Sequence, residues 1–228
     1  MNLKNILVIA AHPDDELLGV GGTIRRFVNE GATARAVIMA EGLTSRGESR
    51  AETNPSELLA LQEDARRAAS EVGYFGIDFC GFPDNRMDSM DLLDIIKTVS
   101  SYVERYKPDT IFTHHHGDLN IDHRLTCEAV LTACRPVGDY CVKRIYAFET
   151  PSSTEWNYNY TEPFTPNVYV DVSDTLEAKI RGMACYRTES AEYPHPRSAE
   201  ALRALGRYRG SNAGFGMAES FIVLRTVI

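Results

Sequence analysis

The sequence predicts an α/β protein in which helices cover both faces of a mostly parallel sheet. Short segments rich in Val and Ile recur along the chain, and amphipathic segments separate them. Strand followed by helix, repeated from end to end, is typical of parallel strands joined by connections that cross the sheet. No long polar linker divides the 228 residues, so we expect a single domain over 1–228.

The expected strands are apolar almost without interruption, as in strands that are buried on both faces. They cover 5–11, 34–40, 109–115, 143–149, 167–172 and 220–227. The expected helices place apolar residues three and four positions apart. They cover 17–31, 55–73, 90–106, 122–135, 173–186 and 198–210. Gly31 and Gly73 are typical of helix ends, and the pattern from Ser173 or Asp174 to Glu177 predicts a capping box.

Composition limits the classes of function. The chain is 43% hydrophobic and 25% charged, which is ordinary for a soluble protein, and no apolar run is long enough to span a membrane. A net charge of -8 argues against a nucleic-acid partner, since phosphate binding requires clustered Lys and Arg. Five cysteines without C-x-x-C spacing indicate reduced thiols, and we expect no signal peptide, because the N-terminal segment reaches carboxylates too soon for a cleavage site. We therefore expect a cytoplasmic protein with a small-molecule substrate.

Two expected strands end in clusters of His and Asp. His12 and Asp15 follow the first strand, with Pro13 in the turn between them, and His123 follows the strand that ends near Thr113. In an open parallel sheet, functional residues gather beyond the carboxyl ends of the strands. If these two strands lie side by side, the three side chains form a His/His/carboxylate set, which holds catalytic Zn²⁺ and leaves one position for water.

Asp14 is placed beside a ligand of this predicted zinc site, where a carboxylate can act as general base. The role of Asp122 stays open between a helix cap and a group that orients a His. The "GVGGT" segment at 19–23 is a weak match to a dinucleotide loop, because the third Gly of that motif is Ile24. Close packing of the first helix explains these glycines better.

Three segments carry a resemblance to a known family: "AHPDDE" at 11–16, "GGT" at 21–23 and "DH" at 122–123. They closely resemble the zinc-dependent N-acetylglucosamine deacetylases named after PIG-L and LmbE, over a region from Ile6 to the neighbourhood of Ala147. The resemblance implies a Rossmann-like fold and hydrolysis of the acetamide of an N-acetyl amino sugar. It also implies zinc ligation by His12, Asp15 and His123, with Asp14 as general base.

The sequence departs from the family pattern at two positions. Many members have H-x-D-H at the second motif, and the first of these His residues assists the tetrahedral intermediate or the leaving amine; here Asn120 takes its place. A substrate-binding Arg is common on the helix after the second strand, where this chain has Leu61. Arg46 is a candidate substitute, with a solvated surface role as the alternative.

The missing His requires another donor for the oxyanion or the leaving amine. We predict that His195, in the stiff segment "YPHPR", is this general acid or oxyanion donor, with Asn120 as the alternative. Arg197 is a candidate anchor for an anionic part of the substrate. Trp156 is a candidate stacking surface for the sugar, although the same loop aromatics can instead pack down as a lid.

The leading hypothesis is therefore zinc-dependent deacetylation of an N-acetyl sugar that is free or linked to a nucleotide, lipid or metabolite. The alternative is a carbohydrate- or nucleotide-binding protein that has kept the fold and lost the chemistry, as Asn120 suggests. The joint presence of His12, Asp14, Asp15 and His123 argues against it, because a binding protein needs no general base. A nicotinamide enzyme built on "GVGGT" is a third, weaker hypothesis. The sequence leaves the oligomeric state open, with a homo-oligomer as one alternative because relatives often assemble.

Overall fold

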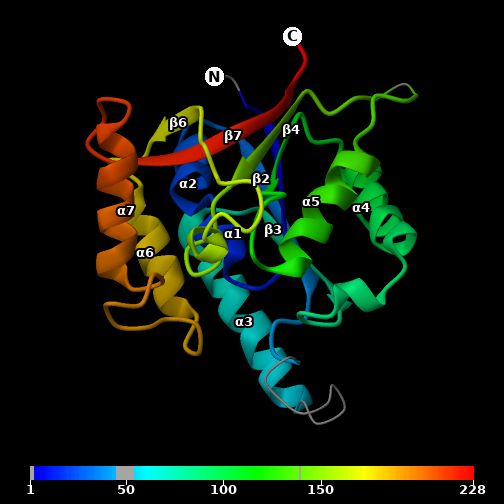
Figure 1. The fold of residues 1–228 in the computed structure, drawn as a ribbon, viewed down its shortest axis with the longest axis horizontal. Helices are drawn as coiled ribbons and strands as arrows, with labels where there is room; N and C mark the ends of the chain where they lie inside the picture. Colours follow the sequence, from blue (N-terminus) through cyan, green and yellow to red (C-terminus); the bar gives the residue numbers. More distant parts are fainter. Residues whose placement is uncertain (1–2, 45–53, 139) are drawn as a thin grey trace.

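The computed structural model describes residues 3–44, 54–138 and 140–228, and within these ranges seven strands form one continuous sheet (Figure 1). The strands are β1 (Asn5–Ala10), β2 (Thr33–Ala40), β3 (Gly76–Phe82), β4 (Thr110–His114), β5 (Arg144–Phe148), β6 (Val168–Asp171) and β7 (Ala218–Thr226). The helices are α1 (Asp15–Leu18), α2 (Gly21–Asn29), α3 (Pro55–Val72), α4 (Leu92–Tyr106), α5 (Ile121–Ala133), α6 (Leu176–Cys185) and α7 (Ala199–Ser211).

The strand order is β3-β2-β1-β4-β5-β7-β6. The first five strands of this order run parallel, and β7 runs antiparallel to both β5 and β6. The sequence prediction of a mostly parallel α/β sheet is therefore confirmed. The antiparallel edge lies beyond β5, away from the strands that carry the His and Asp clusters.

Helices cover both faces of the sheet, and the alternation of side chains along β1 shows why. Ile6 and Val8 belong to a core shared with α2, α3, α6 and α7, whereas Leu7 and Ile9 belong to a second core shared with α4 and α5. Figure 1 shows α6 and α7 on one side of the sheet and α4 and α5 on the other. Every side chain of β1 after Asn5 is buried, as the continuous apolar run predicts.

The first predicted helix, 17–31, is divided into α1 and α2 in the structure. Gly19 lies at the break, and a Cβ built on it would be 2.2 Å from Cδ2 of Phe148. A Cβ on Gly22 would be 3.1 Å from Val172. The glycines of "GVGGT" therefore serve the close packing that the sequence indicates, since no larger residue fits at Gly19.

Two details of the sequence prediction are wrong. β3 was not among the expected strands, because its sequence "GIDFCGF" mixes a charge and two glycines with the apolar residues. The capping box is also absent: Thr175 precedes the first turn of α6 and makes no side-chain capping bond. Ser173 instead donates its hydroxyl to Asp171, 2.6 Å away, in a turn that ends β6.

The end of β1 lies beside the end of β4, because the two strands are paired in parallel through Ile6 to Val8. The turn after β1 and the loop that leads to α5 therefore meet at the same edge of the sheet, as the sequence predicts. Two later loops, after β5 and after α6, supply further residues to this edge. None of the described helices combines the length and apolar character that a bilayer crossing requires.

Candidate metal and catalytic site

Three potential metal ligands meet where β1 and β4 end. His12 and Asp15 follow β1, and His123 lies in the first turn of α5. Nδ1 of His12 is 3.2 Å from Nε2 of His123, and Oδ2 of Asp15 is 3.3 Å from each of these nitrogens. In a tetrahedral zinc site with bonds of about 2.0–2.1 Å, adjacent ligand atoms are about 3.3 Å apart. The three atoms therefore have the spacing that a tetrahedral metal ion requires.

The other ring nitrogen of His12 faces two carboxylates. Nε2 is 3.1 Å from Oδ2 of Asp122 and 3.2 Å from Oδ1 of Asp84. Asp122 is itself fixed, because its oxygens accept the backbone N–H groups of Asn85 at 2.7 Å and Met87 at 3.0 Å. The carboxylate thus orients the imidazole and keeps Nδ1 available as a ligand. Of the two roles left open for Asp122, the structure supports the orienting one.

Asp84 and Asp122 are also close enough to Nε2 of His12 to form a second group of potential metal ligands. The same imidazole belongs to both groups. When Nδ1 is directed at Asp15 and His123, a neutral ring carries its proton on Nε2 and donates it to the carboxylates. The two carboxylates therefore act best as partners of the His12 ring, and the His12, Asp15 and His123 group is the better metal centre.

His123 has its own orienting carboxylate, Asp118. Oδ1 of Asp118 is 3.1 Å from Nδ1 of His123. The hydroxyls of Ser153 and Thr154, in the loop after β5, both donate to Asp118, the second over 2.5 Å. The backbone N–H of Asn120 donates to Oδ1 over 2.9 Å. Contacts with the ring and these donors outweigh the effect of burial and hold the pKa of Asp118 well below its usual range.

His114, the last residue of β4, supports the site without facing its opening. It is fully buried and stacks on His123 with ring centroids 3.9 Å apart. Nε2 accepts the backbone N–H of Ala11 over 2.8 Å, and Nδ1 faces the hydroxyl of Thr150 at 3.2 Å. Burial and the neighbouring His123 lower its pKa well below the usual value. A neutral, structural imidazole agrees with the sequence interpretation of this residue as part of an extended strand.

Asp14 is held in a strained backbone conformation. Its φ of 104° lies in the left-handed region that non-glycine residues rarely adopt. The side chain of Glu16 accepts the backbone N–H of Asp14 over 3.0 Å, and the buried hydroxyl of Tyr186 donates to Glu16 over 2.6 Å. Burial raises the pKa of Glu16 to about 7. This network fixes the turn, so that Asp14 and Asp15 point in different directions.

Arg197 is the charged partner of Asp14. Its Nη1 donates to Oδ2 of Asp14 over 2.7 Å and to Glu189 over 3.1 Å, and its Nε donates to Ser152 over 2.8 Å. Burial raises the pKa of Asp14 well above its usual value, whereas the positive charge of Arg197 opposes that rise. Three protein acceptors therefore engage Nη1 and Nε of the guanidinium that the sequence suggested as a substrate anchor.

Carboxylates surround the imidazoles of His12 and His123 and favour their protonated forms in the metal-free chain. Burial lowers their pKa, but hydrogen bonds with Asp122 and Asp15 raise that of His12 to about 10. Contacts with Asp15 and Asp118 outweigh burial at His123 and raise its pKa to about 9. The same imidazoles hold the pKa of Asp15 well below its usual value. A cation is therefore strongly favoured at this point, whether it is a proton or a metal ion.

Asn120 lies at the start of α5 and acts as its N-cap. Its Oδ1 accepts the backbone N–H of Asp122 over 2.8 Å, and its Nδ2 donates to Asn85 over 2.7 Å. Leu61 is buried in the core beside Gly42. Arg46, its suggested substitute, lies outside the described residues.

His195 precedes Arg197, the partner of Asp14, by two residues. Its Nδ1 accepts the backbone N–H of Arg197 over 3.1 Å, and its ring meets that of Trp156 edge-on at 6.5 Å. Within the described ranges, no hydrogen bond or ion pair joins it to the three ligands. The structure thus places His195 and Trp156 together, next to the residue that holds Asp14.

Sequence reasoning missed Asp84, Asp118 and Glu16 as members of the site. Asp118 carried a usable signal, because it lies five residues before the predicted ligand His123 in the same loop. Asp84 follows β3, which the sequence analysis did not predict. The expectation that functional residues follow the ends of strands therefore could not identify it. Glu16 is part of "AHPDDE", but nothing local shows that its side chain turns back to the Asp14 backbone.

Comparison with known proteins adds independent evidence. A family model described as PIG-L: GlcNAc-PI de-N-acetylase matches residues 7–134, more than half of the chain and the part that holds all three candidate ligands. The chain is 27% identical to the diacetylchitobiose deacetylase of Thermococcus kodakarensis over 229 residues, which covers 96% of this chain and 82% of that protein.

Solved structures share the fold. The N,N'-diacetylchitobiose deacetylase of Pyrococcus horikoshii has a TM-score of 0.77 at 19% identity, over 98% of this chain and 84% of that one. The 4-carboxy-2-hydroxymuconate hydratase of Pseudomonas putida KT2440 has a TM-score of 0.75 at 20% identity, over 99% of this chain and 98% of that one. A deacetylase and a hydratase are thus equally similar in fold, so the reaction must be argued from the site.

Proposed function

Because this chain belongs to the PIG-L family of de-N-acetylases, we propose that it hydrolyses the acetamide of an N-acetylglucosamine-type sugar to a free amine and acetate, with zinc at His12, Asp15 and His123. One observation carries this proposal. Three ligand atoms at 3.2–3.3 Å from one another adjoin a buried carboxylate, Asp14, that is ion-paired with Arg197. A ligand set of two His and one carboxylate leaves a coordination position for water and substrate.

Zinc bound at such a centre lowers the pKa of water and polarises the carbonyl to be attacked. The residues of the chain supply the proton transfers. Asp14 accepts the proton of the attacking water, and the Arg197 charge favours the ionised form of this carboxylate, against the rise in pKa that burial causes. Bond formation to the carbonyl carbon is followed by cleavage of the C–N bond, and the departing nitrogen takes up a proton.

His195 remains our proposal for the donor to the oxyanion or the departing amine. It is supported by its contact with Trp156 and by its bond from the backbone N–H of Arg197, the partner of Asp14. Trp156 remains the proposed stacking surface for the sugar. Arg197 is better described as a partner of Asp14 than as an anchor for an anionic substrate, because its Nη1 and Nε already donate to Asp14, Glu189 and Ser152.

We also propose a cytoplasmic location. All five cysteines belong to the described part of the chain and each is a free thiol, which agrees with a reducing compartment. The proposed partner is the sugar substrate alone, and a homo-oligomer remains an open alternative.

The test is an amine-release assay with N-acetyl hexosamines, free and linked to nucleotides or lipids, on protein whose metal has been removed and then restored. We expect turnover that depends on zinc. Asp14→Asn should keep about one zinc per chain and lose rate by about 10²- to 10⁴-fold. An Asp14→Asn protein as active as the wild type would contradict the assignment of the base. Sugar binding without turnover by zinc-loaded protein would favour the alternative of a carbohydrate-binding protein.

A further inference from the structure

Glu16 is a buried carboxylate to which the proposed reaction assigns no role. Its Oε2 accepts the backbone N–H of Asp14 over 3.0 Å, and its Oε1 accepts the hydroxyl of Tyr186 over 2.6 Å. A carboxylate with no access to water is costly unless hydrogen bonds satisfy its oxygens. The two bonds therefore form one connection, which runs from Tyr186 at the end of α6 through Glu16 to the backbone of Asp14.

This connection ends at a residue in an unfavourable backbone conformation. Asp14 has φ at 104° and ψ at -29°. A residue with a Cβ keeps such a positive φ only when its surroundings impose it, and such strain is common at functional sites. On the other side of the residue, Leu17 and Leu18 donate their backbone N–H groups to the carbonyl of Asp14 over 3.0 Å and 2.9 Å. Both backbone groups of Asp14 are thus held, and with them the direction of its Cα–Cβ bond.

The loop after α6 acts on Asp14 twice. Tyr186 reaches its backbone N–H through Glu16, and Arg197 donates to its carboxylate over 2.7 Å. Glu189 joins the two ends of this loop: its backbone N–H donates to the carbonyl of Tyr186 over 3.3 Å, and its carboxylate accepts from Arg197 over 3.1 Å. One loop therefore holds both the backbone and the side chain of the proposed base.

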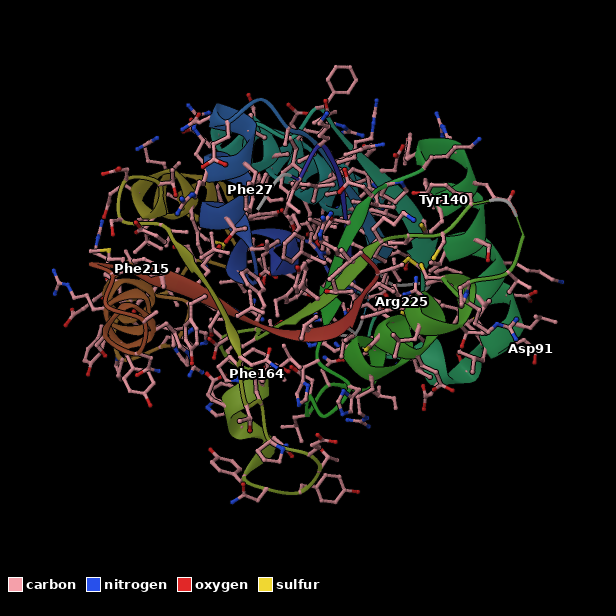
Figure 2. The ribbon with its side chains drawn as sticks, turned by 90° about the horizontal axis from the view of Figure 1, so that it is seen from above. Phe27, Asp91, Tyr140, Phe164, Phe215 and Arg225 are labelled. Atoms are coloured by element: carbon pink, nitrogen blue, oxygen red, sulfur yellow. The ribbon has the colours of Figure 1, made fainter. Side chains whose placement is uncertain are left out.

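Tyr186 and the groups that orient the ligand imidazoles come from different parts of the molecule. Tyr186 belongs to the core shared with α2, α3, α6 and α7, whereas His123 lies on α5, on the other side of the sheet. Figure 2 shows the two sides from above, with Phe215, just after α7, on one side and Asp91, just before α4, on the other. The carboxylates that face the ligand imidazoles lie in α5, in the loop before it and after β3. The support of the proposed base is therefore separate from the support of these imidazoles.

We propose that Tyr186 is a positioning residue for the proposed base: through Glu16 it holds the strained backbone of Asp14 and thereby the direction of the carboxylate. The inference rests on the proposed function and adds to it a residue that acts through another. The adjacent ligand Asp15 has its own support, because its carboxylate accepts the backbone N–H of His12 over 2.8 Å. Loss of the Tyr186 hydroxyl should therefore reduce the rate and leave metal binding unchanged.

The chain offers a matched pair of variants for the test. Tyr186 and Tyr74 are both buried, and both hydroxyls donate to Glu16. Tyr186 donates to the carboxylate, whereas Tyr74 donates to the backbone carbonyl over 3.0 Å. Tyr186→Phe and Tyr74→Phe each remove one buried hydroxyl and keep the ring, so the two variants should lose similar amounts of stability. Only Tyr186→Phe removes a bond from the carboxylate that holds Asp14.

The first measurement needs no substrate. Exchange of the Asp14 backbone N–H with solvent is followed by NMR on zinc-loaded protein, since a buried and bonded amide exchanges slowly. We expect this exchange to be about tenfold faster in Tyr186→Phe and unchanged in Tyr74→Phe. Unchanged exchange in Tyr186→Phe would overturn the proposal. Equal acceleration in the two variants would also overturn it, because it would reflect only a loss of overall stability.

Amine release from N-acetylglucosamine, at constant zinc content, gives the second measurement. In Tyr186→Phe, kcat should fall about 10- to 10²-fold with KM unchanged, whereas Tyr74→Phe should keep a kcat near that of the wild type. In the Asp14→Asn background, Tyr186→Phe should lower kcat no further, because it acts through Asp14. A further loss in that background, or equal losses in the two tyrosine variants, would overturn the proposal and leave the proposed function intact.

The two measurements also separate this proposal from the proposed function. The wild type could show slow exchange of the Asp14 N–H that depends on Tyr186 and yet release no amine from N-acetylglucosamine or its nucleotide- and lipid-linked forms. That result would support the hold of Tyr186 on Asp14 and refute the proposed function.

Discussion

The guanidinium of Arg197 donates to the carboxylate of Asp14 over 2.7 Å, although 183 positions separate the two residues in the chain. Asp14 is buried, and its backbone is strained with φ at 104°. An isolated carboxylate in such surroundings would take up a proton and lose its use as a base. The loop before α7 therefore places a positive charge beside the carboxylate that we propose as the base.

Replacing Arg197 by Met should shift the pH profile of the enzyme toward alkaline pH. The Arg197 charge opposes the rise that burial causes in the pKa of Asp14, so its loss raises that pKa further. Because the base works only when ionised, the acid limb of kcat/KM should move to higher pH. Relative to the wild type, the activity of Arg197→Met should therefore be lowest at acidic pH. The profile is measured at constant zinc occupancy.

In Arg197→Lys the acid limb of kcat/KM should return part of the way to its wild-type position. Lysine restores the positive charge but lacks the several planar N–H donors of the guanidinium. Arg207→Met, on the exposed face of α7, is the matched control. An acid limb that stays in place in Arg197→Met would show that the pair has only a structural role.

The architecture could be predicted from the sequence because it depends on local periodicity. Continuous apolar strands and helices with a three- and four-residue spacing indicated the parallel sheet. The ends of β1 and β4 then predicted that His12, Asp15 and His123 lie close together, as they do. This worked because parallel pairing places strand ends at one edge of the sheet. The strand β3 was not predicted, because its apolar side chains are mixed with Asp78, Gly76 and Gly81.

The surroundings of the ligands could not be predicted, because they depend on contacts between distant segments. Ser153 and Thr154 reach Asp118 from the loop after β5, and Tyr186 reaches Glu16 from the end of α6. No periodicity links residues that are 35 or 170 positions apart. The carboxylates that orient His12 and His123 are visible only when these loops are in place.

Zinc binding should release protons. In the metal-free chain the pKa of His12 is raised to about 10 and that of His123 to about 9, so both rings favour the protonated form at pH 7. A metal needs the nitrogen lone pairs, so binding displaces about one to two protons, and affinity should fall as pH falls below these values. Calorimetric titration of zinc in buffers of different ionisation enthalpy measures the number of protons released for each metal ion bound.

His12→Ala and His123→Ala should each empty the site, as measured by metal analysis of the purified protein. His116→Ala is the control, because this exposed imidazole contacts Glu162 and lies outside the ligand set. Full zinc occupancy in His12→Ala, or proton release of zero, would refute the proposed centre.

Asp118→Asn should weaken zinc binding without abolishing it. The carboxylate faces Nδ1 of His123 and accepts three hydrogen bonds, so the substitution loosens the orientation of a ligand and lowers its basicity. Loss of such a partner costs about 10- to 100-fold in metal affinity. Competition with a chelator measures the change, with the exposed Asp88→Asn as control. Unchanged affinity in Asp118→Asn would show that packing alone orients His123.

The final prediction distinguishes His195 from Asn120 as the donor to the oxyanion or leaving amine. His195→Ala should leave zinc content and fold unchanged while kcat and kcat/KM fall together, by about 10²- to 10³-fold, since the contact is made mainly in the transition state. Asn120→Ala removes the cap of α5 and should cost about 1 kcal/mol of stability. Asn120→Asp keeps the capping oxygen and removes only the amide donor, so it separates capping from catalysis. Near-normal kcat in His195→Ala, together with inactivity of a folded, zinc-loaded Asn120→Asp, would identify Asn120 as the donor.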